Sequence, residues 1–149
     1  MNTVSELLED KGRKIWSIAA TQSVYQAISM MAEMEVGALT VVDDDSQLIG
    51  IISERDYARK VILKNRASRD TAISEIMTRE VTFVDEEATL ETCMSLMTEA
   101  KIRHLPVIDG KTPIAMITVG DVLKVIIQEQ NVAIEELESY IMDETGGSG

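Results

Sequence analysis

The sequence predicts an α+β fold in which one β-α-β-β-α unit occurs twice, with the copies related by a pseudo-twofold axis and flanked by an N-terminal and a C-terminal helix. Two observations support this prediction. Residues 17–43 align in order with residues 83–109, and after a one-residue gap in a turn, residues 50–56 align with residues 115–121. Within each copy, the spacing of apolar residues alternates between that of a helix and that of short strands.

Each copy is expected to begin with a short strand, at residues 15–18 and 81–84, and to continue into an amphipathic helix. Apolar residues spaced i, i+3, i+4 and i+7 lie on one face of a helix, and both copies have this spacing. The residues concerned are Val24, Ala27, Ile28 and Met31 in the first copy and Leu90, Cys93, Met94 and Met97 in the second.

Two further strands and a closing helix complete each unit. The strands are expected at residues 39–42 and 49–52 in the first copy, and at 105–108 and 114–117 in the second. The closing helices are expected to begin near Glu54 and Val119. One such unit has too few layers to bury its own sheet, so the two copies are expected to share a core.

These elements divide the chain into an N-terminal helical segment at 1–11, a first repeat at 12–66, a second repeat at 74–130, a C-terminal helix at 131–145 and a flexible Gly/Ser tail at 146–149. The C-terminal helix carries Ile134, Leu137 and Ile141 on one face. That face either packs on its own chain or forms a dimer contact.

The composition argues against several classes of function. A net charge of −12 repels phosphate backbones, so general binding of nucleic acids is not expected. The single cysteine, Cys93, cannot form an internal disulfide, and no apolar run is long enough to span a membrane, so a cytoplasmic location is expected. The sequence lacks a P-loop, a cluster of metal ligands and a nucleophile paired with a base. We therefore expect that the protein is not an enzyme and requires no metal or cofactor.

The charge balance is reversed in one stretch of the chain. Residues 55–69 carry six basic side chains although the chain as a whole is acidic. Such a stretch marks either an anion-binding site or the solvated face of a helix.

The two copies match well where a strand ends in a hydroxyl residue and an Asp follows three positions later, as Ser53 with Asp56 and Thr118 with Asp121. Helix capping explains this pattern without a ligand, because Ser and Thr are good N-caps and the helix dipole favours a carboxylate in the first turn. The same geometry suits a nucleotide, because a helix N-terminus binds phosphate and a carboxylate accepts hydrogen bonds from ribose hydroxyls. Recurrence at equivalent positions strengthens the second interpretation.

Several segments resemble the tandem CBS-domain pair, also called the Bateman module. The resemblance covers about residues 12–130, and it looks closest to the stand-alone, single-pair proteins of bacteria and mitochondria. The matching segments are Gly-Ile-Ile-Ser-Glu-Arg-Asp-Tyr-Ala-Arg-Lys at 50–60, Ile-Met-Thr at 76–78, Ile-Arg-His-Leu-Pro-Val at 102–107 and Thr-Val-Gly-Asp at 118–121.

The resemblance implies that an adenosine compound, such as AMP, ADP, ATP, S-adenosylmethionine or NAD, binds in clefts between the repeats. Asp56 and Asp121 would hold the ribose hydroxyls of the two clefts. The remaining implied contacts are Ser53 and Thr118 near ribose and phosphate, Ile51 and Met116 against adenine, Ser17, Ile18, Thr82 and Val84 beside the base, and Arg55, Arg103 and His104 on phosphate, with Ala38 at the position of His104 in the first copy.

Two departures from the family pattern predict that the clefts are unequal. Ala115 stands where the motif often has Gly, and an added methyl group can crowd backbone that approaches a ligand. Gly37 and Ala38 replace the pair Arg103 and His104 of the second copy. We therefore expect the cleft built around Asp56 to be the stronger site.

The function expected from the resemblance is a regulatory adenine-nucleotide-binding module that senses energy or redox state through AMP, ADP, ATP or NAD(H). Such pairs usually form homodimers with a disc of four repeats, and an unidentified protein target is expected. The alternatives are an oligomerisation scaffold with vestigial sites and a nucleotide hydrolase.

Overall fold

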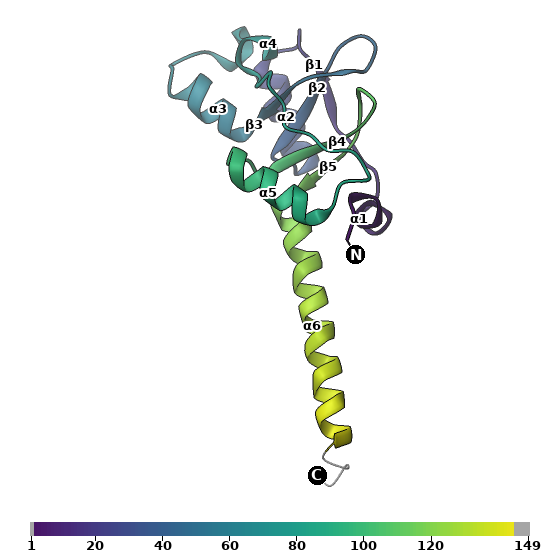
Figure 1. Cartoon of the computed structure of the whole chain (residues 1–149). Helices are drawn as coiled ribbons and strands as arrows, with labels where there is room; N and C mark the ends of the chain where they lie inside the picture. The colour runs from purple at the N-terminus through teal and green to yellow at the C-terminus, as the bar shows by residue number, and fades with distance from the viewer. Residues whose placement is uncertain (1, 145–149) are drawn as a thin grey trace.

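The computed structural model describes residues 2–144 and consists of two α+β halves with one long helix projecting from them (Figure 1). The expected tail at 146–149, and residue 145 of the expected C-terminal helix, lie outside the described residues. Within residues 2–144, no helix combines the length and the apolar character needed to cross a membrane.

The first half is a three-stranded sheet packed against helix α2 (Val24–Met34). Its strands are β1 (Ser17–Ala19), β2 (Ala38–Val42), which is parallel to β1, and β3 (Leu48–Ser53), which is antiparallel to β2. Helix α2 begins at a capping box of Ser23 and Gln26 and ends where Glu35 adopts the left-handed conformation, with φ of 56°. Its buried face packs on β2 and β3 as the apolar spacing predicts.

The second half repeats this arrangement with one strand fewer. It contains α5 (Leu90–Ala100), β4 (His104–Asp109) and β5 (Thr112–Thr118), with the two strands antiparallel. The strand expected at 81–84 is wrong, because only Val84 forms a bridge there, to Val107. Pro106 accounts for the loss. The equivalent Thr40 donates its backbone N–H to the carbonyl of Trp16 at 3.2 Å, and proline has no N–H to donate.

The remaining helical segments connect and flank the halves. They are α1 (Val4–Lys11), α3 (Glu54–Tyr57), which continues into a π-helical turn at Ala58–Ile62, a 3-10 turn at Ser68–Asp70, α4 (Ile73–Ile76) and α6 (Val119–Glu144). The structure corrects the expected separation between a closing helix and a second helix beginning at residue 131. Helix α6 runs through both regions because it contains no Pro and its one Gly, Gly120, lies in the first turn.

The segments that precede the two halves are exchanged between them. Helix α1 precedes the first half but buries Val4, Leu7 and Leu8 in the core of the second half. Helix α4 precedes the second half but buries Ile73 and Ile76 in the core of the first. The backbone bonds match as well: the N–H of α2's first residue donates to Thr71 at 2.8 Å, and that of α5's first residue donates to Asn2 at 2.9 Å. This symmetric exchange is consistent with the predicted pseudo-twofold relation and ties the two halves together. The buried residues nevertheless form two separate clusters and not the single shared core that was expected.

Candidate functional site

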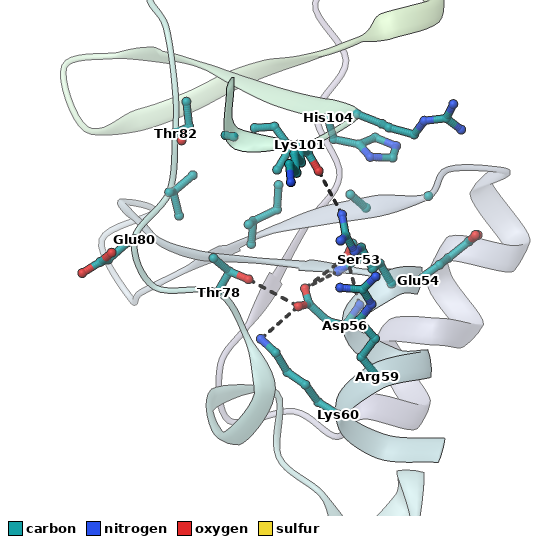
Figure 2. Close-up of a pocket in the computed structure, with 18 residues that line it drawn as sticks. Ser53, Glu54, Asp56, Arg59, Lys60, Thr78, Glu80, Thr82, Lys101 and His104 are labelled. Atoms are coloured by element: carbon teal, nitrogen blue, oxygen red, sulfur yellow. Dashed lines mark hydrogen bonds and ion pairs between the residues drawn. The ribbon is translucent and has the colours of Figure 1, made fainter. Parts of the chain in front are cut away.

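A cleft of about 520 Å³ lies between the two halves (Figure 2). Three segments form it: the end of β3 with α3, the linker that follows α4, and the turn from α5 into β4. Its lining residues are 37–38, 51, 53–56, 59–60, 78, 80–82 and 100–104. Both halves and the linker therefore contribute to one space.

Asp56 lies at the base of this cleft and is only 9% exposed. Its carboxylate accepts hydrogen bonds from the backbone N–H of Ser53 at 3.0 Å and from the Ser53 hydroxyl at 3.1 Å, both through Oδ2. The Ser53 hydroxyl in turn accepts from the backbone N–H of Asp56 at 3.2 Å. These bonds form a capping box, so the capping interpretation is confirmed. The same aspartate nevertheless lines a cleft.

The second carboxylate oxygen of Asp56 faces a cation and a hydroxyl. Lys60 Nζ lies 3.0 Å from Oδ1 and also donates to the carbonyl of Ile76 at 2.9 Å. Thr78 donates its hydroxyl to Oδ1 at 3.3 Å, and Figure 2 shows these three side chains turned toward one another. Because the carboxylate already has partners on both oxygens, a ligand hydroxyl must replace one of them. The Lys60 side chain is 44% exposed, which makes it the easiest partner to displace into solvent.

The cleft gathers positive charge in an acidic chain. Its basic lining residues are Arg55, Arg59, Lys60, Lys101 and Arg103, while its acidic residues besides Asp56 are Glu54 and Glu80. Arg55 spans the cleft by donating to the carbonyl of Lys101 at 2.9 Å. Part of the basic stretch at 55–69 therefore borders the cleft, as an anion site requires. Arg66 and Arg69 do not: Arg66 pairs with Glu75 at 2.7 Å, and Arg69 stacks on Tyr25.

His104 is the half-buried histidine of the cleft wall. Burial lowers its pKa, an effect that the nearby Glu54 carboxylate partly offsets. Gly37 packs against the imidazole so closely that a Cβ at residue 37 would lie 3.0 Å from Cε1 and Nε2. The missing side chain at residue 37 is therefore what leaves room for His104.

Gly50 permits a close contact between β3 and the linker. The backbone of Ile51 and Thr78 exchanges two hydrogen bonds, at 3.0 and 2.9 Å. A Cβ on Gly50 would lie 2.7 Å from Met77 Sδ and 3.1 Å from the Thr78 carbonyl oxygen. Glycine at this position thus brings Thr78 within reach of Asp56.

The second motif has the same local geometry in a different setting. Asp121 accepts from the backbone N–H of Thr118 at 2.9 Å, and the Thr118 hydroxyl accepts from the backbone N–H of Asp121 at 3.1 Å. Lys11, the last residue of α1, places its Nζ 2.5 Å from Asp121 Oδ2 and 2.7 Å from the carbonyl of Met116. A cation from elsewhere in the chain therefore occupies the acceptor that the motif presents.

The structure brings together eight of the residues that the sequence assigned to nucleotide binding, all in the Asp56 cleft: Ala38, Ile51, Ser53, Arg55, Asp56, Thr82, Arg103 and His104. It does not bring six others there: Ser17, Ile18, Val84, Met116, Thr118 and Asp121. Ser17 bonds to the hydroxyl of Thr40 at 2.6 Å, and the side chains of Ile18 and Val84 lie in the two cores.

Sequence reasoning missed several lining residues of the cleft, among them Glu80 and Lys101. Lys101 ends α5 in the left-handed conformation, with φ of 56°, and no pattern in the sequence connects that turn to Asp56. Thr78 carried a usable signal, because it lies in one of the segments that resemble the family.

Comparisons with known proteins agree with this geometry. A family model for the CBS domain matches residues 4–63 and again residues 73–128. The mitochondrial CBS domain-containing protein CBSX3 of Arabidopsis thaliana is 39% identical over 148 residues, which cover 93% of this chain and 71% of that protein.

Solved structures give the same result. A protein with CBS domains from Burkholderia ambifaria MC40-6 is 46% identical, with a TM-score of 0.80 over 86% of this chain and 96% of that one. The CBS domain pair of protein MJ0100, solved with 5′-methylthioadenosine and S-adenosylmethionine, shares the fold at 23% identity, with a TM-score of 0.77 over 85% of this chain and 97% of that one. The chain belongs to the CBS-domain family and carries that domain twice, as a tandem pair.

Proposed function

We propose that this protein is a regulatory module that binds an adenine nucleotide in the Asp56 cleft and does not chemically transform it. The candidate ligands are AMP, ADP, ATP and NAD(H), so the module would report energy or redox state. The observation that carries the proposal is a largely buried aspartate at the base of a cleft whose walls are rich in Arg and Lys. The cleft volume lies within the range of roughly 300–1,000 Å³ that is usual for small-molecule sites.

The contacts around Asp56 suggest how the ribose would bind. The two vicinal hydroxyls of a ribose would donate to Oδ1 of the carboxylate and replace the Thr78 hydroxyl and Lys60, whose side chain is 44% exposed. The displaced ammonium group would then lie near Arg59, where it could neutralise phosphate. Ligand binding would thus replace the ion pair between Asp56 and Lys60 by one between Lys60 and the phosphate of the nucleotide. A neutral nucleoside has no phosphate and would not compensate for the lost ion pair.

The position of the cleft supports a signalling role. Asp56 belongs to the first half, Arg103 and His104 to the second, and Thr82 to the linker between them. A nucleotide that touches all three would favour one arrangement of the halves over others, which is the condition for a ligand to shift a conformational equilibrium. The output would pass to a protein target or across a homodimer.

The related MJ0100 structure supports the class of ligand, because that protein was solved with two adenosine compounds. The location of this protein in the cytoplasm stays a prediction, and CBSX3 is named as a mitochondrial protein.

The proposal is tested by thermal unfolding of the protein with AMP, ADP, ATP, NAD, NADH, S-adenosylmethionine and adenosine in parallel. A ligand at 100 times its dissociation constant should stabilise the fold by roughly 2.7 kcal/mol, and phosphorylated ligands should outperform adenosine. Absence of any shift across the panel would contradict the proposal and leave the oligomerisation scaffold. Chromatography of the nucleotide after prolonged incubation should recover it unchanged, and appearance of hydrolysis products would establish the enzyme instead.

A further inference from the structure

The ammonium group of Lys60 occupies the part of Asp56 that the helix cap leaves open. The cap uses Oδ2, which accepts from Ser53. Lys60 Nζ lies 3.0 Å from the other oxygen, Oδ1, and donates to the carbonyl of Ile76 at 2.9 Å. The Thr78 hydroxyl donates to the same Oδ1 at 3.3 Å, as Figure 2 shows. A ribose that binds Asp56 must therefore compete with a side chain of the protein itself.

This ion pair differs from a pair between two solvated side chains on a helix surface. The side chain of Asp56 is 11% exposed, whereas that of Lys60 is 44% exposed. A carboxylate that is withdrawn from water depends on its protein partners, because little hydration replaces them. Lys60 carries its charge on a flexible four-carbon stem, so its ammonium group moves away without a change in the backbone. Asp56 is thus the fixed member of the pair and Lys60 the movable one.

The displaced lysine needs a new counter-ion. A phosphate monoester carries about −1.5 to −2 charges at pH 7, against one on a carboxylate, so Lys60 gains when it exchanges Asp56 for a phosphate. A ligand without phosphate leaves the ammonium group unpaired beside Arg55 and Arg59, which line the same cleft. The exchange therefore favours a nucleotide and disfavours a nucleoside.

The charges of the cleft wall act in the same direction. Five Lys and Arg side chains line the cleft, against three Asp and Glu side chains. S-adenosylmethionine carries a sulfonium cation and no phosphate, and 5′-methylthioadenosine carries neither charge. Both compounds would release Lys60 without compensation, and the first would add a positive charge to a basic wall. Protein MJ0100, which was solved with these two compounds, is related in fold at 23% identity.

We propose that Lys60 determines ligand specificity, as an internal competitor that restricts the Asp56 cleft to phosphorylated adenine nucleotides. It lowers the affinity for every adenosine compound by holding Asp56, and it restores affinity only to compounds whose phosphate accepts the released ammonium group. Nucleosides and their thioether and sulfonium derivatives are excluded. This inference rests on the proposed function, because it concerns the same cleft and adds which adenosine compounds the cleft accepts.

Isothermal titration calorimetry with AMP and with adenosine, on the wild type and on Lys60→Met, tests the competitor. Adenosine should bind the variant more tightly by about threefold, the scale of a partly exposed ion pair. AMP should bind it more weakly by about tenfold, because its phosphate loses a charged partner. The two ligands thus respond with opposite signs. Damage to the cleft would weaken both ligands, and loss of a simple phosphate contact would leave adenosine unchanged.

Two neighbouring cations serve as matched controls. Arg59 also lines the cleft, so Arg59→Met should weaken AMP and leave adenosine unchanged. Lys64 belongs to the same basic stretch but lies outside the cleft lining, so Lys64→Met should change neither affinity. Unchanged or weaker binding of adenosine to Lys60→Met would overturn the proposal. An equal gain of adenosine affinity in either control variant would also overturn it, because the effect would then be one of net charge.

Ionic strength gives a test on the unmodified protein. Raising NaCl from about 50 to about 500 mM screens the pair between Asp56 and Lys60, so AMP should bind more weakly while adenosine binds at least as well. A parallel loss of both affinities would contradict the role of Lys60. If neither ligand binds the wild type, the proposed function fails and this inference fails with it. If AMP binds but adenosine gains nothing in Lys60→Met, only the role of Lys60 fails.

Discussion

Asp56 and Asp121 occupy equivalent positions in the two halves, and each is held by the backbone N–H of the hydroxyl residue three positions earlier, at 3.0 and 2.9 Å. They differ in the lysine that pairs with them. Lys60 lies four residues after Asp56 on the same helical segment, whereas Lys11 reaches Asp121 from α1, more than a hundred residues away in sequence. Similar motifs therefore give similar caps, but the rest of the fold decides what surrounds the aspartate: Asp56 lines the cleft between the halves, whereas Lys11 pairs with Asp121.

The two lysines are also held differently. Lys60 lies at the edge of the cleft on an irregular turn of helix. Lys11 ends a helix that is anchored by Val4, Leu7 and Leu8 in the second core. Both lysines also donate to a backbone carbonyl, Lys60 to that of Ile76 at 2.9 Å and Lys11 to that of Met116 at 2.7 Å, and their side chains are 44% and 36% exposed. What separates the two sites is that Asp56 and Lys60 line the cleft between the halves. Under the proposed function, we therefore expect one nucleotide per chain, in the Asp56 cleft.

The largest test of this difference is removal of each carboxylate charge. Asp56→Asn should lower nucleotide affinity by roughly 100-fold, since hydrogen bonds to a charged group contribute about 1.5–3 kcal/mol each. Asn keeps the capping acceptor, so the fold should survive. Asp121→Asn is the matched control and should leave affinity within a factor of about two, measured by isothermal titration calorimetry. Equal losses in the two variants would mean that both aspartates bind ligand.

Reciprocal substitutions at Gly50 in β3 and at the equivalent Ala115 in β5 test the close contact between β3 and the linker. Gly50→Ala should destabilise the fold by about 1–3 kcal/mol, because its Cβ meets Met77 and the Thr78 carbonyl. Ala115→Gly, the reciprocal change, should cost no more than about 1 kcal/mol. Urea unfolding monitored by circular dichroism measures both. A Gly50→Ala variant as stable as the wild type would show that the linker moves aside easily.

Removal of Lys11 tests whether that side chain closes the second site. Lys11→Met should raise the nucleotide stoichiometry above one per chain, and the stability change should not exceed about 1 kcal/mol, because the ion pair is partly exposed. Lys14→Met removes the same charge from the loop that follows α1 and should leave the stoichiometry at one. If the stoichiometry of Lys11→Met also stays at one nucleotide per chain, then Lys11 is not what closes the Asp121 site, and Ala115 and its surroundings exclude the ligand instead.

The smallest expected effect concerns His104, whose counterpart in the first half is Ala38. Burial lowers the pKa of His104 below its usual value of 6.5, so the unfolded chain binds the proton more tightly. The stability contributed by the neutral imidazole is complete above pH 6.5 and declines as the pH falls toward the folded-state pKa. His104→Gln should flatten this decline in denaturant midpoints measured between pH 7 and pH 5. A steeper decline of stability in the variant would mean that folding raises the pKa of His104 instead of lowering it.

The sequence was sufficient for the architecture because its signals are local. The apolar spacing of α2 and α5, and the pairing of Ser53 with Asp56, each depend on residues within one or two helical turns. The strand predicted at 81–84 was wrong for a reason visible in the sequence, since Pro106 lies at the position of a backbone donor. The expectation of two separate helices in the C-terminal region was wrong, because residues 119–144 form one continuous helix that contains no Pro.

The contacts that decide accessibility could not be predicted, because they join distant segments. Nothing in the residues around Lys11 indicates that its amine lies on Asp121, and Lys101 approaches Arg55 only through the packing of the two halves. The pairing of Lys11 with Asp121 follows from the position of α1 on the second half, which no short sequence pattern predicts.

That exchange has a consequence for the origin and handling of the molecule. Each half holds the other's leading segment in its core, which is the arrangement of a domain-swapped dimer whose two subunits have been fused into one chain. A single proteolytic cut in the exposed loop near residues 64–67 would therefore not release two separate domains. The two fragments would stay associated, because α1 and α4 remain buried in each other's halves. One repeat expressed by itself would complete its core only by pairing with a second copy.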